Sequence, residues 1–285
     1  KPVGLLLDPK KNIERTVFKT RDDGSFVVRY KAPLGFKSSS PDLGYIKVVV
    51  NAKDDKGRMG SIEIRVFHPP VLLVHGAFSS SKTWTNPKFN MYEALEKRGF
   101  AVRLMDYNQR QSIYESAKEV GEWITIMKKN CIEGIFYVKT EPPYDKVNVT
   151  KVSVVAHSQG GLVVRVYTLG LAEGGYHNDV LRLIMLGTPN HGAPDFMLVR
   201  FGLWIAEKFD PIWKKGPSYE QMMEGSDFMK KINGEDLKQD YVNVEVSYFV
   251  IAGYKMWVDW LTGSPLPKQY LDVGLNDGVV TVKSA

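Results

Sequence analysis

The chain has 285 residues, of which 44% are hydrophobic and 25% are charged. This composition is typical of a globular protein, and it excludes a disordered tail, a collagen-like repeat and a disulfide-stapled miniprotein. The net charge of +6 comes from residues 1–68, which hold 14 basic and 8 acidic side chains, against 24 of each in residues 69–285. The basic residues form no stripe interleaved with aromatic residues, so we expect no nucleic-acid partner. A solvated basic face and a transient contact with a lipid or cell surface are the two explanations of the charge.

Residues 1–68 have the pattern of antiparallel β-strands. We predict strands at 16–19, 26–30, 45–52 and 61–66, separated by turns rich in Asp and Gly that are typical of hairpins. In the last strand Ile62, Ile64 and Val66 alternate with polar residues, as a half-buried strand requires. The segment therefore predicts a small all-β sandwich domain, and it resembles the immunoglobulin-like modules that precede catalytic domains in secreted microbial enzymes.

After the stiff Pro69-Pro70 hinge the pattern changes to alternating strands and helices. We predict strands at 71–74, 100–105, 152–156, 181–186 and 248–252, and helices at 113–129 and 159–172. This alternation indicates an α/β domain over residues 69–285, with a doubly wound, mostly parallel sheet. In such sheets the chemistry lies beyond the carboxyl ends of the strands, so the loops there hold the candidate residues.

Ser158 lies in such a loop, between the predicted strand 152–156 and the helix that follows it. A serine on a sharp strand-to-helix turn is exposed above the sheet, and the turn needs small residues two positions before and two positions after the serine. Ala156 and Gly160 meet that need. Ser158 is therefore a candidate nucleophile, and a helix N-cap is the alternative.

A serine that attacks a carbonyl group needs two backbone donors for the oxyanion that forms. The N–H of Gln159, at the start of the helix, is one candidate. The other comes from the loop after His75-Gly76, where Ala77 is the first choice and Phe78 is the alternative. A plain strand-to-helix turn that needs glycine would also explain His75-Gly76.

Two later loops add to this pattern. Residues 187–192 read Gly-Thr-Pro-Asn-His-Gly, and we interpret them as a wall of the site, with His191 a hydrogen-bonded loop residue. Asp277, in the Asn-Asp-Gly-Val-Val turn of residues 276–280, is placed to orient a histidine. Alone, Asp277 would be interpreted as part of an Asp-Gly turn, but its position after Ser158 in the chain favours the catalytic interpretation.

The His-Gly pair, the Ala-His-Ser-Gln-Gly elbow, the Gly-Thr-Pro-Asn-His-Gly loop and the Asn-Asp-Gly-Val-Val turn resemble, in this order, bacterial and archaeal lipases and esterases of the α/β-hydrolase fold. The resemblance covers residues 71–285. It implies that Ser158 is the nucleophile, that Asp277 is the acid, and that Ala77 and Gln159 are the oxyanion donors.

The chain departs from this family in its histidines. The family places the triad histidine after the acid, whereas all five histidines of this chain precede Asp277: His68, His75, His157, His177 and His191. We expect the base to lie in a C-terminal segment beyond Ala285, and a rearranged triad that uses His177 or His191 is the alternative. A molecule truncated at Ala285 is expected to have almost no activity.

The apolar segment 193–231 indicates either a lid over the site or a plain core helix. It contains Trp204, and a second apolar cluster nearer the end of the chain contains Trp257. Together with Phe78, these tryptophans are expected to bind the acyl part of the substrate.

The sequence thus predicts a serine carboxylesterase or lipase that acts on small-molecule or lipid esters. A thioesterase or acyltransferase of the same fold is one alternative, and a non-catalytic surface or ligand-binding module without the triad histidine is another. We expect no cofactor and no catalytic metal, because the sequence has no metal-ligand cluster and no phosphate-binding glycine loop. The single Cys131 excludes an intrachain disulfide. The predicted β-domain alone favours a secreted or cell-surface location.

Overall fold

The chain divides into two compact units. The computed structural model describes residues 5–8, 10–11, 13–14, 16–33, 45–135, 146–193, 216–234 and 242–251. The smaller unit comprises Lys1–His68 with Lys97–Gly99, and the larger unit comprises Pro69–Glu96 with Phe100–Ala285. In the described part of the chain, no helix has both the length and the apolar character that crossing a membrane requires.

The larger unit is built on a parallel sheet of five strands in the spatial order β6-β5-β7-β8-β9. The strands are β5 (Val71–Val74), β6 (Val102–Met105), β7 (Val152–His157), β8 (Val180–Leu186) and β9 (Ser247–Ile251). All residues of β5 are buried, as expected for a strand that is covered on both faces. The predicted parallel sheet is therefore confirmed, and each strand lies within two residues of its predicted bounds.

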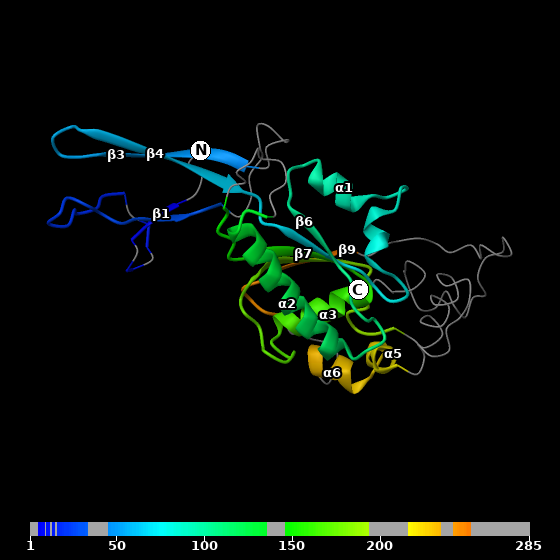
Figure 1. Ribbon diagram of the computed structural model, residues 1–285. Helices are drawn as coiled ribbons and strands as arrows, with labels where there is room; N and C mark the ends of the chain where they lie inside the picture. Colours follow the sequence, from blue (N-terminus) through cyan, green and yellow to red (C-terminus); the bar gives the residue numbers. More distant parts are fainter. Residues whose placement is uncertain are drawn as a thin grey trace. The chain divides into compact units, whose positions relative to one another are not determined.

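Helices cover both faces of this sheet, as Figure 1 shows. On one face lies α1 (Met91–Glu96), whose apolar side chains pack against a buried cluster that includes Leu73 and Trp84. On the other face lie α2 (Ile113–Ile132) and α3 (Gln159–Thr168). Every residue of α3 is buried, so the helix that follows Ser158 is part of the core.

The helix after Ser158 is shorter than predicted. It ends at Thr168 rather than at residue 172, because Gly170 has a left-handed backbone with a φ of 71°. The N–H of Leu171 donates to the carbonyl oxygen of Val166 at 3.1 Å, which is the hydrogen bond that closes a helix in this geometry. The helix therefore spans 10 residues, and the prediction extended it too far.

The strand order contains one switch point, between β5 and β7. From β5 the chain moves outward to β6, then crosses back over β5 and continues outward through β7, β8 and β9 in the opposite direction. Open α/β sheets bind their ligands outside the carboxyl ends of the two strands at such a point. These strands end at Val74 and His157, so the loops that follow them are the expected place of the site.

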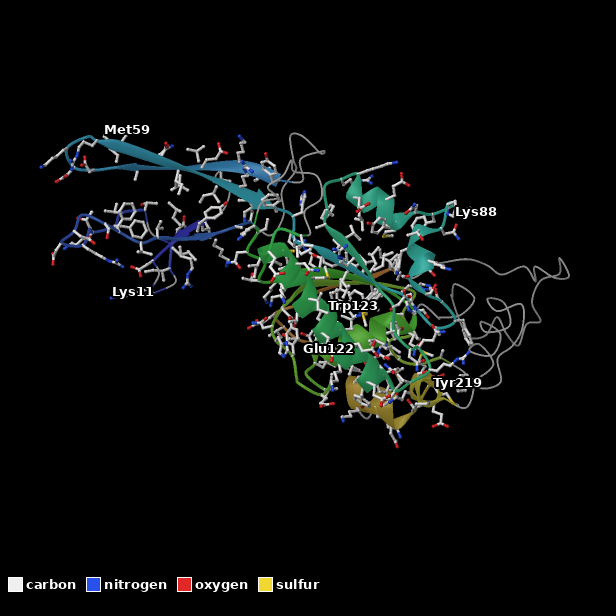
Figure 2. All side chains as sticks on the ribbon, in the orientation of Figure 1. Lys11, Met59, Lys88, Glu122, Trp123 and Tyr219 are labelled. Carbon is white, nitrogen blue, oxygen red and sulfur yellow. The ribbon has the colours of Figure 1, made fainter. Side chains whose placement is uncertain are left out.

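Part of the segment predicted as a lid packs into the larger unit. The structure describes residues 216–231 of it, which form α5 (Pro217–Met222) and most of α6 (Asp227–Asn233). Tyr219 is buried in α5, and its place in the unit is labelled in Figure 2. The N–H of Ile113, the first residue of α2, donates to Oε1 of Gln221 at 2.7 Å. These residues contribute to the core, and residues 194–215 of the predicted lid lie outside the described residues.

The smaller unit contains two separate antiparallel strand pairs among its described residues. β1 (Leu5–Leu7) pairs with β2 (Arg29–Lys31), and β3 (Tyr45–Lys53) pairs with β4 (Met59–Phe67). The hairpin of β3 and β4 confirms the strands predicted at 45–52 and 61–66. Met59, labelled near its tip in Figure 2, is 73% exposed.

Two predictions for this unit are wrong. Residues 16–19 form no strand, and the strand predicted at 26–30 is shorter and pairs with β1 instead. In addition, the sequence predicted that Ile62, Ile64 and Val66 share a buried face of β4. This face is buried only at one end: Val66 is 7% exposed, whereas Ile62 is 62% exposed. The described residues therefore show antiparallel β-structure, and the immunoglobulin-like sandwich stays a prediction.

Candidate active site

The loops after β5 and β7 meet at the carboxyl edge of the sheet. The two strands are neighbours in register, with Val74 opposite Ala156. Gly76 and Ser158 each follow this pair by two residues, which brings them together. A Cβ atom on Gly76 would lie only 2.8 Å from Cβ of Ser158. The lack of a side chain at position 76 therefore lets the loop after β5 approach Ser158.

Ser158 has a strained backbone, with a φ of 51° and a ψ of −125°. A conformation of this kind costs a residue with a side chain about 1–3 kcal/mol, and it is typical of a nucleophile on a strand-to-helix elbow. Ser158 stands at the N-cap position of α3, yet its side chain makes no capping hydrogen bond. Its N–H donates to the carbonyl oxygen of Leu186 in β8 at 2.9 Å, which anchors the elbow to the sheet. The Ser158 hydroxyl therefore does not cap α3, which was the alternative to its role as a nucleophile.

Gly160 allows α3 to pass close to β5. A Cβ atom there would lie 2.4 Å from the carbonyl oxygen of His75 and 2.9 Å from that of Val74. Ordinary van der Waals contact begins near 3.4 Å, so any side chain at this position would force the helix and the strand apart. The small residue that the elbow pattern demands two positions after Ser158 is thus explained by backbone atoms of the neighbouring strand.

Ala77 and Gln159 have backbone donors that are free to bind an anion. Both residues are buried, and their N–H groups donate no hydrogen bond to any other residue that the structure describes. Gln159 is the first residue of α3, where the helix dipole favours negative charge. Phe78, beside Ala77, is partly buried and has a left-handed backbone with a φ of 54°. Two donors of this kind next to a serine can stabilise an oxyanion.

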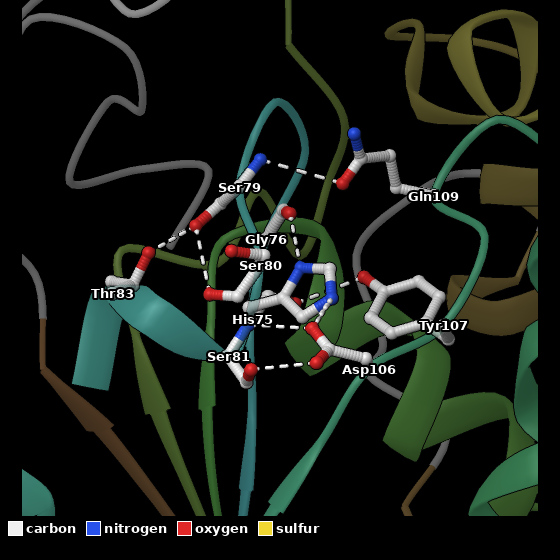
Figure 3. Close-up of polar contacts among 9 residues, drawn as sticks. All are labelled: His75, Gly76, Ser79, Ser80, Ser81, Thr83, Asp106, Tyr107 and Gln109. Carbon is white, nitrogen blue, oxygen red and sulfur yellow. Dashed lines mark hydrogen bonds and ion pairs between the residues drawn. The ribbon is translucent and has the colours of Figure 1, made fainter. Parts of the chain in front are cut away.

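Asp106 and Tyr107, which the sequence analysis did not single out, contact the loop after β5 (Figure 3). Ser81 donates two hydrogen bonds to Asp106, from its N–H to Oδ1 and from its hydroxyl to Oδ2, both at 2.6 Å. The Tyr107 hydroxyl donates to the carbonyl oxygen of His75 at 2.9 Å, and the two rings stack with their centres 4.5 Å apart. Their position directly after the predicted strand 100–105 was the one signal that the sequence offered.

The ring of His75 is buried between polar groups. Its Nδ1 lies 2.8 Å from the carbonyl oxygen of Gly76, and its Nε2 lies 3.5 Å from Oδ1 of Asp106. Burial lowers the pKa of His75, against the opposing effects of the Gly76 carbonyl and the Asp106 charge. Partial burial would raise the pKa of Asp106, but the hydrogen bonds from Ser81 and the charges of His75 and Lys82 outweigh it and hold that pKa below its usual value. Both ring nitrogens of His75 are thus directed at groups other than Ser158.

A buried arginine holds the loop of residues 187–192. Arg165 of α3 is 1% exposed, and it donates to Oδ1 of Asn190 at 3.0 Å and to Oδ1 of Asn233 at 2.8 Å. It also donates to the carbonyl oxygens of Asn190 and Ile232, both at 3.2 Å. The loop that we interpret as a wall of the site is thereby tied to the helix after Ser158 and to the end of α6.

Three of the predicted site residues lie outside the described residues: Asp277, Trp204 and Trp257. The structure therefore brings together Ser158, Ala77 and Gln159, and it does not describe where the predicted acid lies. Within the described ranges, no group of three or more His, Cys, Asp or Glu side chains could hold a metal ion.

Comparison with known proteins gives one family and several similar structures. The sequence model of the family described as "Putative serine esterase (DUF676)" matches residues 70–224. The chain is similar to the mature form of the lipase BlEst2 of Bacillus licheniformis, with 24% identity and a TM-score of 0.55 over 76% of this chain and 78% of that one. It is also similar to the phospholipase PlaB of Legionella pneumophila, with 21% identity and a TM-score of 0.51 over 75% of this chain and 45% of that one.

At these identities the two structures support the fold alone. The chain spans less than half of the length of PlaB. None of the curated proteins matches the chain.

Proposed function

The chain belongs to the serine esterase family whose sequence model matches residues 70–224, and from this premise we propose that it hydrolyses carboxylic esters through an acyl-enzyme on Ser158. The observation that carries the proposal is the strained backbone of Ser158, at the switch point of the sheet. A strained serine persists only where the surrounding structure fixes it, and such residues cluster at functional sites. The N–H groups of Ala77 and Gln159 donate to no other residue among those described, which supports the same assignment.

In the proposed reaction the Ser158 hydroxyl oxygen attacks the ester carbonyl carbon, and its proton passes to a histidine that Asp277 orients. The carbonyl oxygen becomes an oxyanion, which accepts hydrogen bonds from the N–H groups of Ala77 and Gln159. The C–O bond to the alcohol then breaks, the alcohol takes the proton, and the acyl group stays on Ser158. Water attacks this second ester by the same route and releases the carboxylic acid.

The contacts of His75 argue against this histidine as the base. His75 lies two residues before Ala77, and its Nδ1 and Nε2 are directed at Gly76 and Asp106. A base must hydrogen-bond the hydroxyl that it deprotonates, so this ring orientation argues against His75.

We further propose that the acyl group is apolar and that lipid or medium-chain esters are the substrates. Phe78, Trp204 and Trp257 would line its pocket. Two proteins that share the fold are named a lipase and a phospholipase, which is compatible with this substrate class.

Labelling by a fluorophosphonate probe, followed by intact mass measurement, tests the proposal on the full-length protein. We expect one adduct on the wild-type protein and none on the Ser158→Ala variant, with hydrolysis of a p-nitrophenyl ester lost in parallel. Ser153→Ala is the matched control, because Ser153 is a buried serine of β7, the strand that precedes Ser158, and its loss should leave labelling and hydrolysis unchanged. A thioester cleaved faster than the matching ester would indicate a thioesterase. The absence of both adduct and hydrolysis in the wild-type protein would overturn the proposal and favour a non-catalytic module.

A further inference from the structure

The segment that follows β6, residues 106–109, contacts the loop of residues 75–81, which we call the oxyanion loop because it carries Ala77. From these contacts we infer that Asp106 is a positioning residue, which holds the oxyanion loop at the distance from Ser158 that the reaction requires. The inference rests on the proposed function. It adds a residue that neither the sequence motifs nor the family assignment identifies.

Asp106 accepts hydrogen bonds from the far end of the oxyanion loop and lies close to its near end. At the far end Ser81 gives it two hydrogen bonds of 2.6 Å, one from the backbone and one from the side chain. At the near end Nε2 of His75 lies 3.5 Å from the same carboxylate (Figure 3). A loop that is hydrogen-bonded to this carboxylate at one end and lies against it at the other has little freedom to move its middle, where Ala77 lies.

Tyr107 and Gln109 extend this restraint to both proposed oxyanion donors. Tyr107 donates its hydroxyl to the carbonyl oxygen of His75, two residues before Ala77. The side-chain amide of Gln159 donates to the carbonyl oxygen of Gln109 at 2.9 Å. The loop that holds Ala77 and the residue that provides the second donor are therefore bound to one short segment.

The reaction is sensitive to this restraint because an oxyanion forms only in the transition state. A displacement of about 1 Å of a reacting or stabilising group costs about 100-fold in rate, and loss of one oxyanion donor costs about 100- to 1,000-fold in kcat. Binding of the intact ester depends much less on these donors. Loosening the loop should therefore lower kcat and leave KM nearly unchanged.

The test compares Asp106→Asn with the wild type in steady-state ester hydrolysis by the full-length protein. Asparagine keeps the size of aspartate, but its NH₂ group cannot accept the second hydrogen bond from Ser81. We expect kcat to fall by about 10- to 100-fold and KM to stay within about twofold. The affinity for an arylboronic acid, which mimics the tetrahedral intermediate, should fall by the same factor as kcat/KM.

Asp54→Asn is the matched control. Asp54 also accepts backbone hydrogen bonds in a turn, from Lys56 and Arg58, but it lies in the hairpin of β3 and β4. This variant should keep the kinetic constants of the wild type. Thermal unfolding measures the stability of each variant. A general loss of stability would lower the amount of active enzyme, but it would not lower the affinity of the folded fraction for the boronic acid.

A double-mutant cycle with Ser81→Ala identifies the route of the effect. If Asp106 acts through Ser81, the double variant is no slower than Asp106→Asn alone. Ser81→Ala also serves as the test if Asp106→Asn does not fold, because it removes one hydrogen bond and keeps the backbone donor.

The outcomes separate the inference from the function on which it rests. Ser158-dependent hydrolysis with an unchanged kcat in Asp106→Asn would overturn the positioning role and leave the esterase in place. Additive effects in the cycle would overturn the route through Ser81. A wild-type protein without Ser158-dependent hydrolysis would overturn the esterase assignment, and the positioning role with it.

Discussion

Replacement of Gly160 by alanine perturbs the closest approach of two backbone segments in the site. The added Cβ atom would lie 2.4 Å from the carbonyl oxygen of His75, where ordinary contact begins near 3.4 Å, so α3 and β5 would have to separate by about 1 Å. The second contact, 2.9 Å from the carbonyl oxygen of Val74, blocks a simple rotation away from the first. Because both contacts are with backbone atoms, no side-chain rearrangement relieves them.

Two effects on stability oppose each other in this variant. Alanine is favoured over glycine in a helix by up to about 1 kcal/mol, whereas overpacking of a core costs about 1–3 kcal/mol. We therefore expect the free energy of unfolding to fall by about 1–2 kcal/mol. The effect on activity is larger, because a shift of about 1 Å between Ser158 and the oxyanion loop should lower kcat by about 100-fold.

Urea unfolding and ester hydrolysis measure the two effects on the same sample. Gly60→Ala is the control, because Gly60 has an ordinary backbone and a Cβ atom there would meet nothing within 4 Å. The control should keep the wild-type kcat. Should Gly160→Ala retain both the wild-type stability and the wild-type kcat, the close approach of α3 and β5 would not constrain the elbow, and the reasoning would be refuted.

Two further predictions concern buried polar groups. Arg165→Met removes the hydrogen bonds that Arg165 donates to the side-chain oxygens of Asn190 and Asn233, so we expect a loss of about 3 kcal/mol in the free energy of unfolding by urea; an unchanged unfolding midpoint would contradict this. Burial raises the pKa of Cys131 to about 12, so the thiol stays protonated in neutral buffer and should react with Ellman's reagent only after denaturation. Rapid reaction in the native protein would show that the thiol is accessible.

The parallel sheet was predictable because burial on both faces leaves a direct mark on the sequence. The run Val71–Val74 has no polar position, which distinguishes it from a half-exposed strand. The end of α3 was predicted less well. The apolar period continues past Gly170, and the period alone does not detect that glycine has taken a left-handed backbone and closed the helix.

The smaller unit was predicted less well because its strand pairing is not local. The turn at Asp22-Asp23-Gly24 forms, since the N–H of Gly24 donates to the carbonyl oxygen of Arg21, but it does not lead to a hairpin. β2 pairs with β1, which lies more than 20 residues earlier in the chain. A turn signal predicts the partner of a strand only where the two strands are consecutive, so β1–β2 lay outside what this pattern can detect.

In the candidate site, too, features that depend on neighbouring residues were predicted, and contacts between residues far apart in the chain were not. The elbow at Ser158 was predictable because its requirements, a preceding strand and small neighbours, lie within five residues. The contact of Asp106 with Ser81 joins residues 25 positions apart, and neither residue belongs to a motif. Sequence reasoning therefore identifies the groups that would carry out the chemistry. The groups that hold them in place are identified only from the structure, because the order of β6, β5 and β7 brings their loops to one edge of the sheet. Substitutions in the elbow and substitutions at Asp106 should accordingly differ in kind: the first remove the nucleophile or its helix, and the second change how well an intact nucleophile stabilises its transition state.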